Sequence, residues 1–230
     1  MRKAVIFDLD GTLIDSAPDI AHALNRLLEE RGLEAYDLPT VTSFVGHGAP
    51  RLLEQAWAGR GQRAREAHEA KTDLQRFEAL YAEEPTQRTR LYPGAREALT
   101  ALRAAGYDLG ICTNKPEALT HQALKRLGID GLFKAVVGGD TLPERKPSPE
   151  PLALCARHLG AEPASTAYVG DSEVDAATAE AAGAPFLLHT EGYRKGPIRS
   201  RTLRAEFSDF ARLPELVDRL TREGEARHKA

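Results

Sequence analysis

Residues 4–16 read AVIFDLDGTLIDS, in which an apolar run, Ala4–Phe7, stops at two carboxylates with one residue between them. A short apolar run of this kind is typical of a buried strand. Side chains two residues apart in an extended segment point to the same side, so Asp8 and Asp10 are expected to project together beyond the strand. Gly11 then permits a tight turn or a close approach of the backbone to a ligand.

Two carboxylates held close together repel each other and shift each other's pKa values. A divalent cation is the simplest compensation, because Mg²⁺ takes oxygen ligands and commonly uses one or two carboxylates together with phosphate oxygens. The same residues also occur where a strand simply ends in a polar turn. The Asp-x-Asp-Gly motif therefore needs support from the rest of the chain.

The composition indicates a globular protein of one domain, or of one domain with an insertion. Of the 230 residues, 42% are hydrophobic and 28% are charged, as in ordinary folded proteins. The net charge of −3 gives no general electrostatic reason to bind nucleic acid. No segment approaches the roughly 18–20 apolar residues of a membrane span, and the first apolar run is too short for a signal peptide. We therefore expect a cytoplasmic protein without nucleic-acid or membrane partners.

Apolar runs that predict strands alternate with segments of helical periodicity over much of the chain. This alternation predicts an α/β fold, with a Rossmann-like parallel sheet and helices on both faces. The expected strands are residues 4–7, 107–112, 135–137, 166–169 and 186–189. The expected helices lie near residues 95–102, 119–127, 149–159 and 174–182, and each is followed by a glycine.

The segment 17–85 breaks this alternation, because it has helical periodicity and no convincing strand. It is inserted directly after the first expected strand, and ligands of parallel sheets bind at the carboxyl ends of the strands. We therefore predict a small all-α cap over those ends. The α/β core then comprises residues 1–16 and 86–225, and the polar end of the chain, residues 226–230, is expected to be a tail.

Further polar residues follow the later strands. Thr113 and Asn114 offer a hydroxyl and exposed N–H groups that suit a phosphate oxygen, although both residues are also common N-caps. Lys146 lies among prolines and could neutralise a phosphate and a carboxylate, the alternative being a surface lysine. Asp171 and Asp175 have the i, i+4 spacing of one helix face. They could complete an oxygen-rich cation site, unless Asp171 or its neighbour only caps a helix.

The order DxDGT, TN, K-P and GDSxxD resembles the four motifs of the haloacid dehalogenase superfamily of phosphotransferases. The resemblance extends from Ala4 to Tyr193, and a helical cap after the first motif is similar to one subclass. Shorter segments resemble the phosphoglycolate phosphatases of that superfamily. These segments are residues 8–19, 45–48, 92–94, 113–116, 138–140 and 192–193.

The resemblance implies that Asp8 is the nucleophile and forms an aspartyl-phosphate. Asp10 would protonate the leaving group and then deprotonate the attacking water. The implied cofactor is Mg²⁺, bound by Asp8, the backbone carbonyl of Asp10, and Asp171, with Asp175 in a supporting or water-mediated position. Thr113 and Asn114 would hold the phosphoryl group, and Lys146 would anchor both this group and Asp8.

Substrate choice is expected to lie in the cap, because a closing cap covers the leaving group. Gly46, His47 and Gly48 form a flexible loop, and Arg51 follows one turn later as a basic side chain that could meet a substrate carboxylate. Surface roles are the alternative for His47 and Arg51. The basic segment 193–204 could favour anionic substrates or be a solvated loop. The sequence suggests no function for His189.

The expected activity is Mg²⁺-dependent hydrolysis of a small phosphate monoester, first of all 2-phosphoglycolate to glycolate and phosphate. The expected partner is therefore a small phosphorylated metabolite, and the chain would be a monomer or a homodimer. A phosphosugar mutase of the same superfamily is the main alternative, since it would keep the same core residues. A phosphatase or pyrophosphatase with another small substrate also stays open. A non-enzymatic phosphate-binding protein is disfavoured, because binding alone would not require Asp10.

Overall fold

The computed structural model describes residues 3–63, 65–83 and 86–229, with side chains described as far as Gly224. Its centre is a six-stranded parallel sheet in the order β5-β4-β1-β6-β7-β8. Parallel strands buried on both faces read as short continuous apolar runs, which is why the inner strands were recognisable. The strands are β1 Ala4–Phe7, β4 Asp108–Cys112, β5 Phe133–Val137, β6 Ala167–Gly170, β7 Phe186–His189 and β8 Leu203–Phe207.

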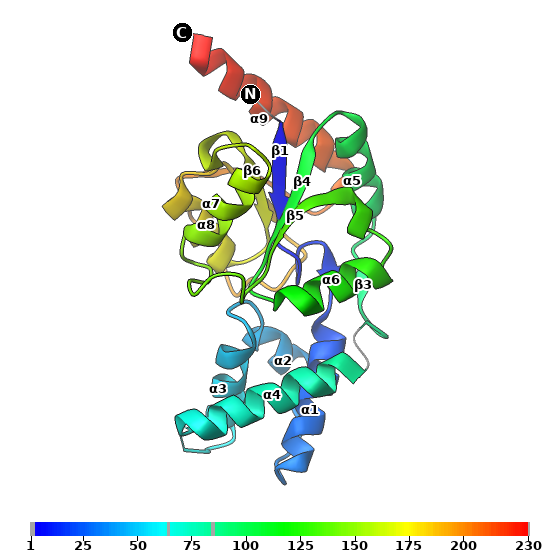
Figure 1. Cartoon of the computed structure of the whole chain (residues 1–230), viewed down its shortest axis with the longest axis vertical. Helices are drawn as coiled ribbons and strands as arrows, with labels where there is room; N and C mark the ends of the chain where they lie inside the picture. The colour runs from blue at the N-terminus through cyan, green and yellow to red at the C-terminus, as the bar shows by residue number, and fades with distance from the viewer. Residues whose placement is uncertain (1–2, 64, 84–85, 230) are drawn as a thin grey trace.

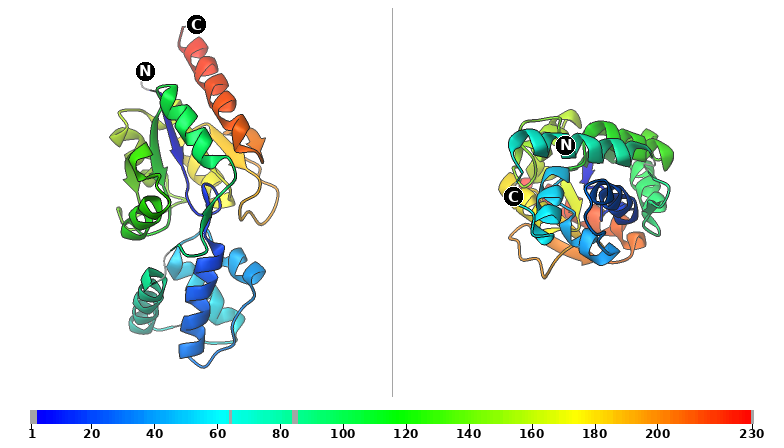
Figure 2. Two further views of the ribbon diagram at one scale, coloured as in Figure 1. Left: turned by 90° about the vertical axis from the view of Figure 1, so that its right-hand side faces the viewer. Right: turned by 90° about the horizontal axis from the view of Figure 1, so that it is seen from below.

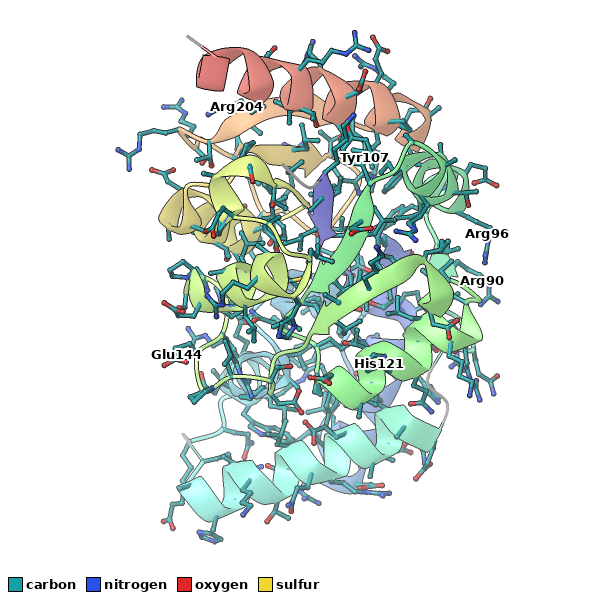
Figure 3. The ribbon with its side chains drawn as sticks, turned by 45° about the horizontal axis from the view of Figure 1, so that its top comes forward. Arg90, Arg96, Tyr107, His121, Glu144 and Arg204 are labelled. Carbon is teal, nitrogen blue, oxygen red and sulfur yellow. The ribbon has the colours of Figure 1, made fainter. Side chains whose placement is uncertain are left out.

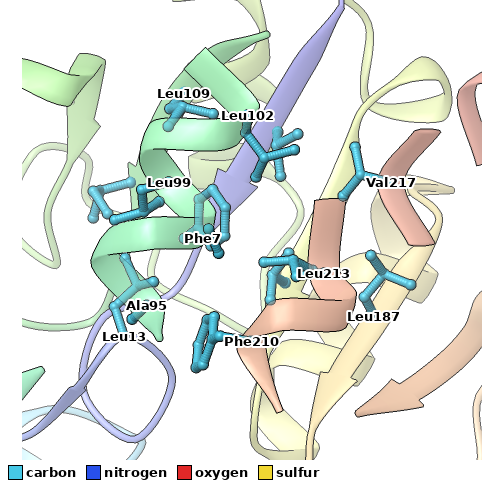
Figure 4. Close-up of a cluster of buried hydrophobic side chains, with 14 of the residues drawn as sticks. Phe7, Leu13, Ala95, Leu99, Leu102, Leu109, Leu187, Phe210, Leu213 and Val217 are labelled. Carbon is cyan, nitrogen blue, oxygen red and sulfur yellow. The ribbon is translucent and has the colours of Figure 1, made fainter. Parts of the chain in front are cut away.

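Helices cover both faces of the sheet, and alternate residues of β1 enter two separate apolar clusters. Val5 and Phe7 belong to a cluster with residues of α5, α6 and α9, and Figure 4 shows Phe7 with labelled residues of α5 and α9. Ala4 and Ile6 belong to a second cluster with residues of α7 and α8 on the other face (Figure 1). This arrangement confirms the predicted Rossmann-like α/β fold. The helices are α5 Ala95–Ala104, α6 Glu117–Arg126, α7 Glu150–His158, α8 Glu173–Ala182 and α9 Leu213–Lys229. Short 3₁₀ turns lie at Asp130–Leu132, Pro163–Ser165 and Phe210–Arg212.

The structure also contains strands and a helical segment that the sequence pattern did not reveal. Strand β8 is a half-exposed edge strand in which charged and apolar residues alternate, with Arg204 exposed at this edge (Figure 3). The strand includes the last two residues of the basic segment 193–204, for which a solvated loop was one expectation. Helix α9 continues to Lys229, so residues 226–229 are helical where a tail was predicted. The structure does not describe Ala230. Among the described residues, no helix is long and apolar enough to cross a bilayer.

The segment 17–83 forms a separate set of helices, here called the cap, with an apolar cluster of its own. Ile20, Leu24, Trp57 and Phe77 are buried together in this cluster. Figure 1 shows the cap at the end of the sheet toward which β1 points, where the carboxyl ends of the strands lie. The predicted cap boundary at residue 85 lies outside the described residues. The cap helices are α1 Ala17–Glu30, α2 Leu38–Phe44, α3 Ala49–Gly59 and α4 Ala67–Glu83.

The chain passes between core and cap twice, and the two crossings lie side by side (Figure 2). Two-residue strands, β2 Ile14–Asp15 and β3 Arg90–Leu91, pair antiparallel at the crossings. The buried Asp19 carboxylate accepts hydrogen bonds from the Thr89 N–H at 2.7 Å and from the Thr89 hydroxyl at 2.6 Å. Asp19 therefore ties the start of the first cap helix to the returning chain.

Replacement of this buried acceptor is expected to destabilise the protein. In Asp19→Ala the Thr89 N–H loses its partner, and an unsatisfied buried donor costs about 1–3 kcal/mol. For a chain of this size that cost lowers the melting temperature by about 2–4 °C per kcal/mol. Differential scanning calorimetry measures the shift.

Glu29→Ala is the matched control, because Glu29 is exposed on the same helix. Its effect should stay within about 0.5 kcal/mol. Equal melting temperatures for Asp19→Ala and Glu29→Ala would contradict the role given to Asp19.

Candidate active site

A cavity of about 60 Å³ lies between the carboxyl ends of the strands and the cap. The core contributes residues that directly follow β1 and β4, and the cap contributes residues of α1, α3, α4 and the loop before α3. The lining residues from the core are Asp8, Asp10, Thr113, Asn114, Lys115, Pro116 and Leu119. Those from the cap are Ile20, Val45, Gly46, Gly48, Ala49, Leu52, Phe77, Glu78 and Tyr81.

Lys146 lies between two carboxylates at the floor of this site. Its Nζ is 2.8 Å from Asp8 Oδ1 and 2.7 Å from Asp175 Oδ1. Burial and the negative charge of Asp175 raise the pKa of Asp8 to about 7, although Lys146 acts in the opposite direction. Burial lowers the pKa of Lys146, but Asp175 and Asp8 outweigh this effect and raise it overall. The lysine therefore remains charged between its two partners.

The Asp175 carboxylate is saturated with donors. The Tyr168 hydroxyl donates to its Oδ1 at 2.7 Å, and the Ser172 hydroxyl donates to its Oδ2 at 2.6 Å. Burial opposes ionisation of Asp175, yet Lys146 and these donors lower its pKa overall. Ser172 is also the N-cap of α8 and forms a capping box with Asp175. The helix-capping alternative considered for this motif is thus correct for Ser172, and it coexists with the place of Asp175 beside Lys146.

Asp171 is buried with far less compensation. Its Oδ1 accepts a hydrogen bond from the Thr12 hydroxyl at 2.7 Å, and its Oδ2 accepts one from the Tyr193 N–H at 2.7 Å. Burial, together with the charges of Asp175 and Asp8, raises its pKa well above the usual range. Gly11, with φ of +88°, leaves room for this carboxylate, because a Cβ there would lie 2.4 Å from Asp171 Oδ2.

The three carboxylates fit a hard divalent cation. One oxygen each of Asp8, Asp171 and Asp175 lies within 4.8 Å of the others. Lys146 is the only basic side chain that ion-pairs with them within the described part of the chain. The cluster therefore carries an excess of negative charge, and its donors are the oxygen ligands that such ions prefer.

Asp10 lies beside Asp8 in the cavity lining, as the alternation of the strand predicted. Its Oδ1 accepts hydrogen bonds from the Ser16 hydroxyl at 2.6 Å and from Lys115 Nζ at 3.2 Å. Its carboxylate keeps some exposure, 15% of the side-chain surface. Asp10 is therefore held in place by donors while it still faces the cavity.

Thr113 and Asn114 lie where the sequence placed them, at the end of β4. Thr113 is buried, and its hydroxyl accepts a hydrogen bond from the Lys115 N–H at 3.2 Å. The Asn114 amide donates to the carbonyls of Gly46 at 3.0 Å and Lys146 at 3.1 Å, and accepts from the Lys146 N–H at 3.0 Å. The Asn114 side chain thus joins the cap loop to the loop that carries the site lysine.

Two residues predicted in the cap do not reach the cavity. His47 is exposed and does not line it. Arg51 is 60% exposed and pairs with Glu54 Oε2 at 2.6 Å, also away from the lining. Of the predicted cap loop, Gly46 and Gly48 line the cavity. A basic residue one turn into a helix can face several directions, and packing of the cap turned Arg51 toward the surface.

Several residues at the site escaped the sequence analysis. Lys115 and Tyr81 line the cavity, and Lys115 Nζ donates to the Tyr81 hydroxyl at 2.9 Å. The Tyr193 hydroxyl accepts from the Ser16 and Ala17 N–H groups at 2.8 and 3.0 Å, so it holds the first crossing. The available signal for Lys115 and Tyr193 was that segments 113–116 and 192–193 resemble phosphoglycolate phosphatases, although neither residue was given a role. Tyr81 and Tyr193 become neighbours of the site only through tertiary folding.

His189, which had no account in the sequence, supports the turn after the two aspartates. Its Nδ1 lies 3.1 Å from the Gly11 carbonyl oxygen. Its ring packs against Tyr92, with ring centroids 4.6 Å apart. Burial lowers the pKa of His189, which favours the neutral ring that donates this hydrogen bond.

The chain was compared with protein-family models, curated proteins and solved structures. Residues 5–189 match the haloacid dehalogenase-like hydrolase family. The phosphoglycolate phosphatase of Cereibacter sphaeroides ATCC 17029 is 48% identical over 216 residues, covering 94% of this chain and 98% of the relative. That of Rhodospirillum rubrum is 46% identical over 216 residues, covering 93% and 90%.

Among solved structures, a predicted phosphoglycolate phosphatase from Haemophilus somnus 129PT superposes with a TM-score of 0.86. It is 34% identical in sequence, and the match covers 94% of this chain and 97% of that one. The family model spans most of the chain, and the relatives match it over nearly their whole length. The chain therefore belongs to the haloacid dehalogenase-like hydrolase family, as its four motifs predicted.

Proposed function

We propose that this protein hydrolyses a small phosphate monoester, 2-phosphoglycolate in particular, to an alcohol and inorganic phosphate. The observation that carries the proposal is the pair Asp8 and Asp10 in one cavity, with Lys146 on the first carboxylate and Asp171 beside it. A nucleophile, a proton donor and a cation site are then within reach of one phosphate group. The names of the relatives point to the same substrate.

In the first step, an oxygen of Asp8 attacks phosphorus in line and the bond to the ester oxygen breaks. Asp10 gives its proton to the departing oxygen, which leaves as an alcohol. In the second step, Asp10 takes a proton from water, whose oxygen attacks phosphorus and releases the Asp8 carboxylate. Lys146 holds Asp8 Oδ1 at 2.8 Å and offsets the repulsion between this carboxylate and the phosphate.

Mg²⁺ is the proposed cofactor, held by Asp8 and Asp171 with the Asp10 carbonyl, while Asp175 orients Lys146. Bound there, Mg²⁺ would supply positive charge to the phosphate oxygens as charge spreads in the transition state. Asp171 suits this role because its carboxylate has only two hydrogen-bond donors among the described residues. The cytoplasmic location and the oligomeric state stay predictions.

The cavity is small and is lined on the cap side largely by apolar side chains. Its volume is about 60 Å³ with the cap joined to the core through Asn114 and Gly46. Apolar side chains of the cap, among them Leu52 and Phe77, close over it. The mutase alternative is the weaker one, because the relatives are named phosphoglycolate phosphatases.

The first test is steady-state phosphate release from several esters, with and without Mg²⁺. The panel contains 2-phosphoglycolate, glucose 6-phosphate, β-glucose 1-phosphate and pyrophosphate. We expect release to require Mg²⁺ and kcat/KM to be highest for 2-phosphoglycolate. Equal slow release from all four compounds would contradict the proposed substrate, and conversion of β-glucose 1-phosphate to the 6-phosphate would support a mutase.

Asp8→Asn removes the proposed nucleophile while keeping its shape. We expect kcat to fall at least ~10³-fold, which corresponds to about 4 kcal/mol of the barrier. Acid-quenched reactions with ³²P-labelled substrate should leave hydroxylamine-sensitive label on the wild-type protein and none on the variant. Asp130→Asn, at an exposed position, is the control. Activity or bound label retained in Asp8→Asn would show that another group attacks phosphorus.

Thermal unfolding tests the cation site without measuring turnover. The folded protein raises the pKa of Asp8 to about 7 and that of Asp171 above its usual range. Protonation of such groups stabilises the metal-free protein in acid, and this contribution is lost as pH rises through the folded pKa. We expect Mg²⁺ to raise the melting temperature, and to do so more at pH 8 than at pH 6, because protons compete with the ion for Asp8.

Asp171→Asn should raise the melting temperature of the metal-free protein at pH 8, since it removes a buried charge from a like-charged cluster. It should also abolish the increase caused by Mg²⁺. Asp130→Asn again serves as the control and should respond to Mg²⁺ like the wild type. An undiminished Mg²⁺ response in Asp171→Asn would place the ion elsewhere.

A further inference from the structure

Lys115 is a buried cation in the cavity wall that the phosphoryl chemistry does not use. Its side chain is 4% exposed. Its Nζ lies 3.2 Å from Asp10 Oδ1 and 2.9 Å from the Tyr81 hydroxyl oxygen, with the Tyr81 ring centroid 4.4 Å away. Lys115 comes from the core and Tyr81 from cap helix α4, so the pair lies where the two parts meet.

A count of donors shows that this pair has hydrogen-bonding capacity to spare. A lysine ammonium has three N–H donors. Among the described residues its acceptors are both oxygens of Asp10, at 3.2 and 3.4 Å, and the Tyr81 hydroxyl oxygen at 2.9 Å. The Tyr81 oxygen accepts from Lys115, so the Tyr81 proton can be donated elsewhere. Burial raises the pKa of Tyr81, which keeps that proton in place. The Tyr81 O–H is therefore available for an anion in the cavity, beside a lysine whose two contacts with Asp10 are long.

Lys115 also supplies the positive charge in the lining of the cavity. Within the described chain, it is the only lysine or arginine that lines the cavity, where the acidic residues are Asp8, Asp10 and Glu78. Although burial lowers the pKa of Lys115, Asp10 and Tyr81 raise it overall. Glu78 has Asp140 and Arg145 as its charged neighbours, and these residues do not line the cavity.

We propose that Lys115, assisted by the Tyr81 hydroxyl, binds a carboxylate of the substrate and thereby selects phosphate esters that carry a carboxylate next to the leaving oxygen. This inference rests on the proposed function and deepens it by assigning the specificity-determining residue. It also replaces Arg51, which the sequence suggested for this role and which lies at the surface.

The geometry of a two-carbon substrate agrees with this assignment. In 2-phosphoglycolate a single methylene separates the carboxylate from the ester oxygen that Asp10 would protonate. A carboxylate adjacent to that oxygen must lie close to Asp10, and Lys115 Nζ is 3.2 Å from Asp10 Oδ1. Charge-assisted hydrogen bonds in a buried site are strong and directional. A longer substrate would carry its carboxylate past Lys115 toward the apolar side chains of the cap.

The competing interpretation is that Lys115 only orients Asp10. The two roles differ in substrate dependence, since a residue that orients Asp10 affects every ester equally. The test therefore compares 2-phosphoglycolate with 2-hydroxyethyl phosphate, in which a neutral hydroxymethyl group replaces the carboxylate. The quantity measured is the ratio of kcat/KM for the two substrates, in the Mg²⁺-loaded full-length protein.

Lys115→Met is expected to lower kcat/KM for both substrates, because Asp10 loses a partner, and to lower the ratio by a further ~10–100-fold. Arg51→Met, a basic residue outside the cavity, should leave the ratio unchanged. Tyr81→Phe keeps Lys115 and should lower the ratio by about 3–10-fold, the worth of one hydrogen bond. This second variant tests the same site if Lys115→Met fails to fold.

The outcomes separate the two proposals. A wild-type ratio near one would overturn the proposed substrate. A high wild-type ratio that Lys115→Met and Tyr81→Phe leave unchanged, with both rates falling equally, would overturn the carboxylate site while the proposed function stands. A ratio that falls in both variants and not in Arg51→Met supports the assignment.

Discussion

Within the described chain, the cluster of Asp8, Asp171 and Asp175 depends on one buried ammonium group, that of Lys146. Lys146 contacts Asp8 at 2.8 Å and Asp175 at 2.7 Å, and a lone lysine cannot neutralise the whole acidic cluster. Burying like charges is costly unless something compensates. Folding thus holds these side chains in an arrangement that the proposed cation and phosphate would complete. Burial, together with the negative charge of Asp175, accordingly raises the pKa of Asp8 and of Asp171.

Hydrogen bonds connect this acidic cluster to the segments that cross between the core and the cap. Tyr193 donates its N–H to Asp171, and its hydroxyl donates to Asp15 at 2.7 Å while it accepts from the first crossing. Asp19 joins that crossing to the returning chain. One residue of the core therefore contacts both a candidate metal ligand and the connection to the cap.

Much of the core site was predictable because it follows strands that the sequence marks clearly. Asp8, Thr113 and Asp171 each come directly after a buried strand, and Asp10 follows Asp8 by two residues. Parallel strands place their carboxyl ends at one edge of the sheet. The cap was less predictable, since helical periodicity shows which residues are buried but not which way two packed helices face the core. The sequence therefore could not show that Arg51 faces the surface or that Tyr81 faces the cavity.

The sequence by itself determined the α/β core, the position of the helical insertion and the acidic residues of the site, because these follow from local periodicity and from strand ends. Only the tertiary structure decided which cation meets Asp10. Lys115 and Tyr81 are far apart in the chain and meet because α4 packs over the end of β4. Edge strand β8 and the turn held by His189 likewise depend on neighbours distant in sequence. Contacts of this kind carry no local signal, since they form only when the layers pack.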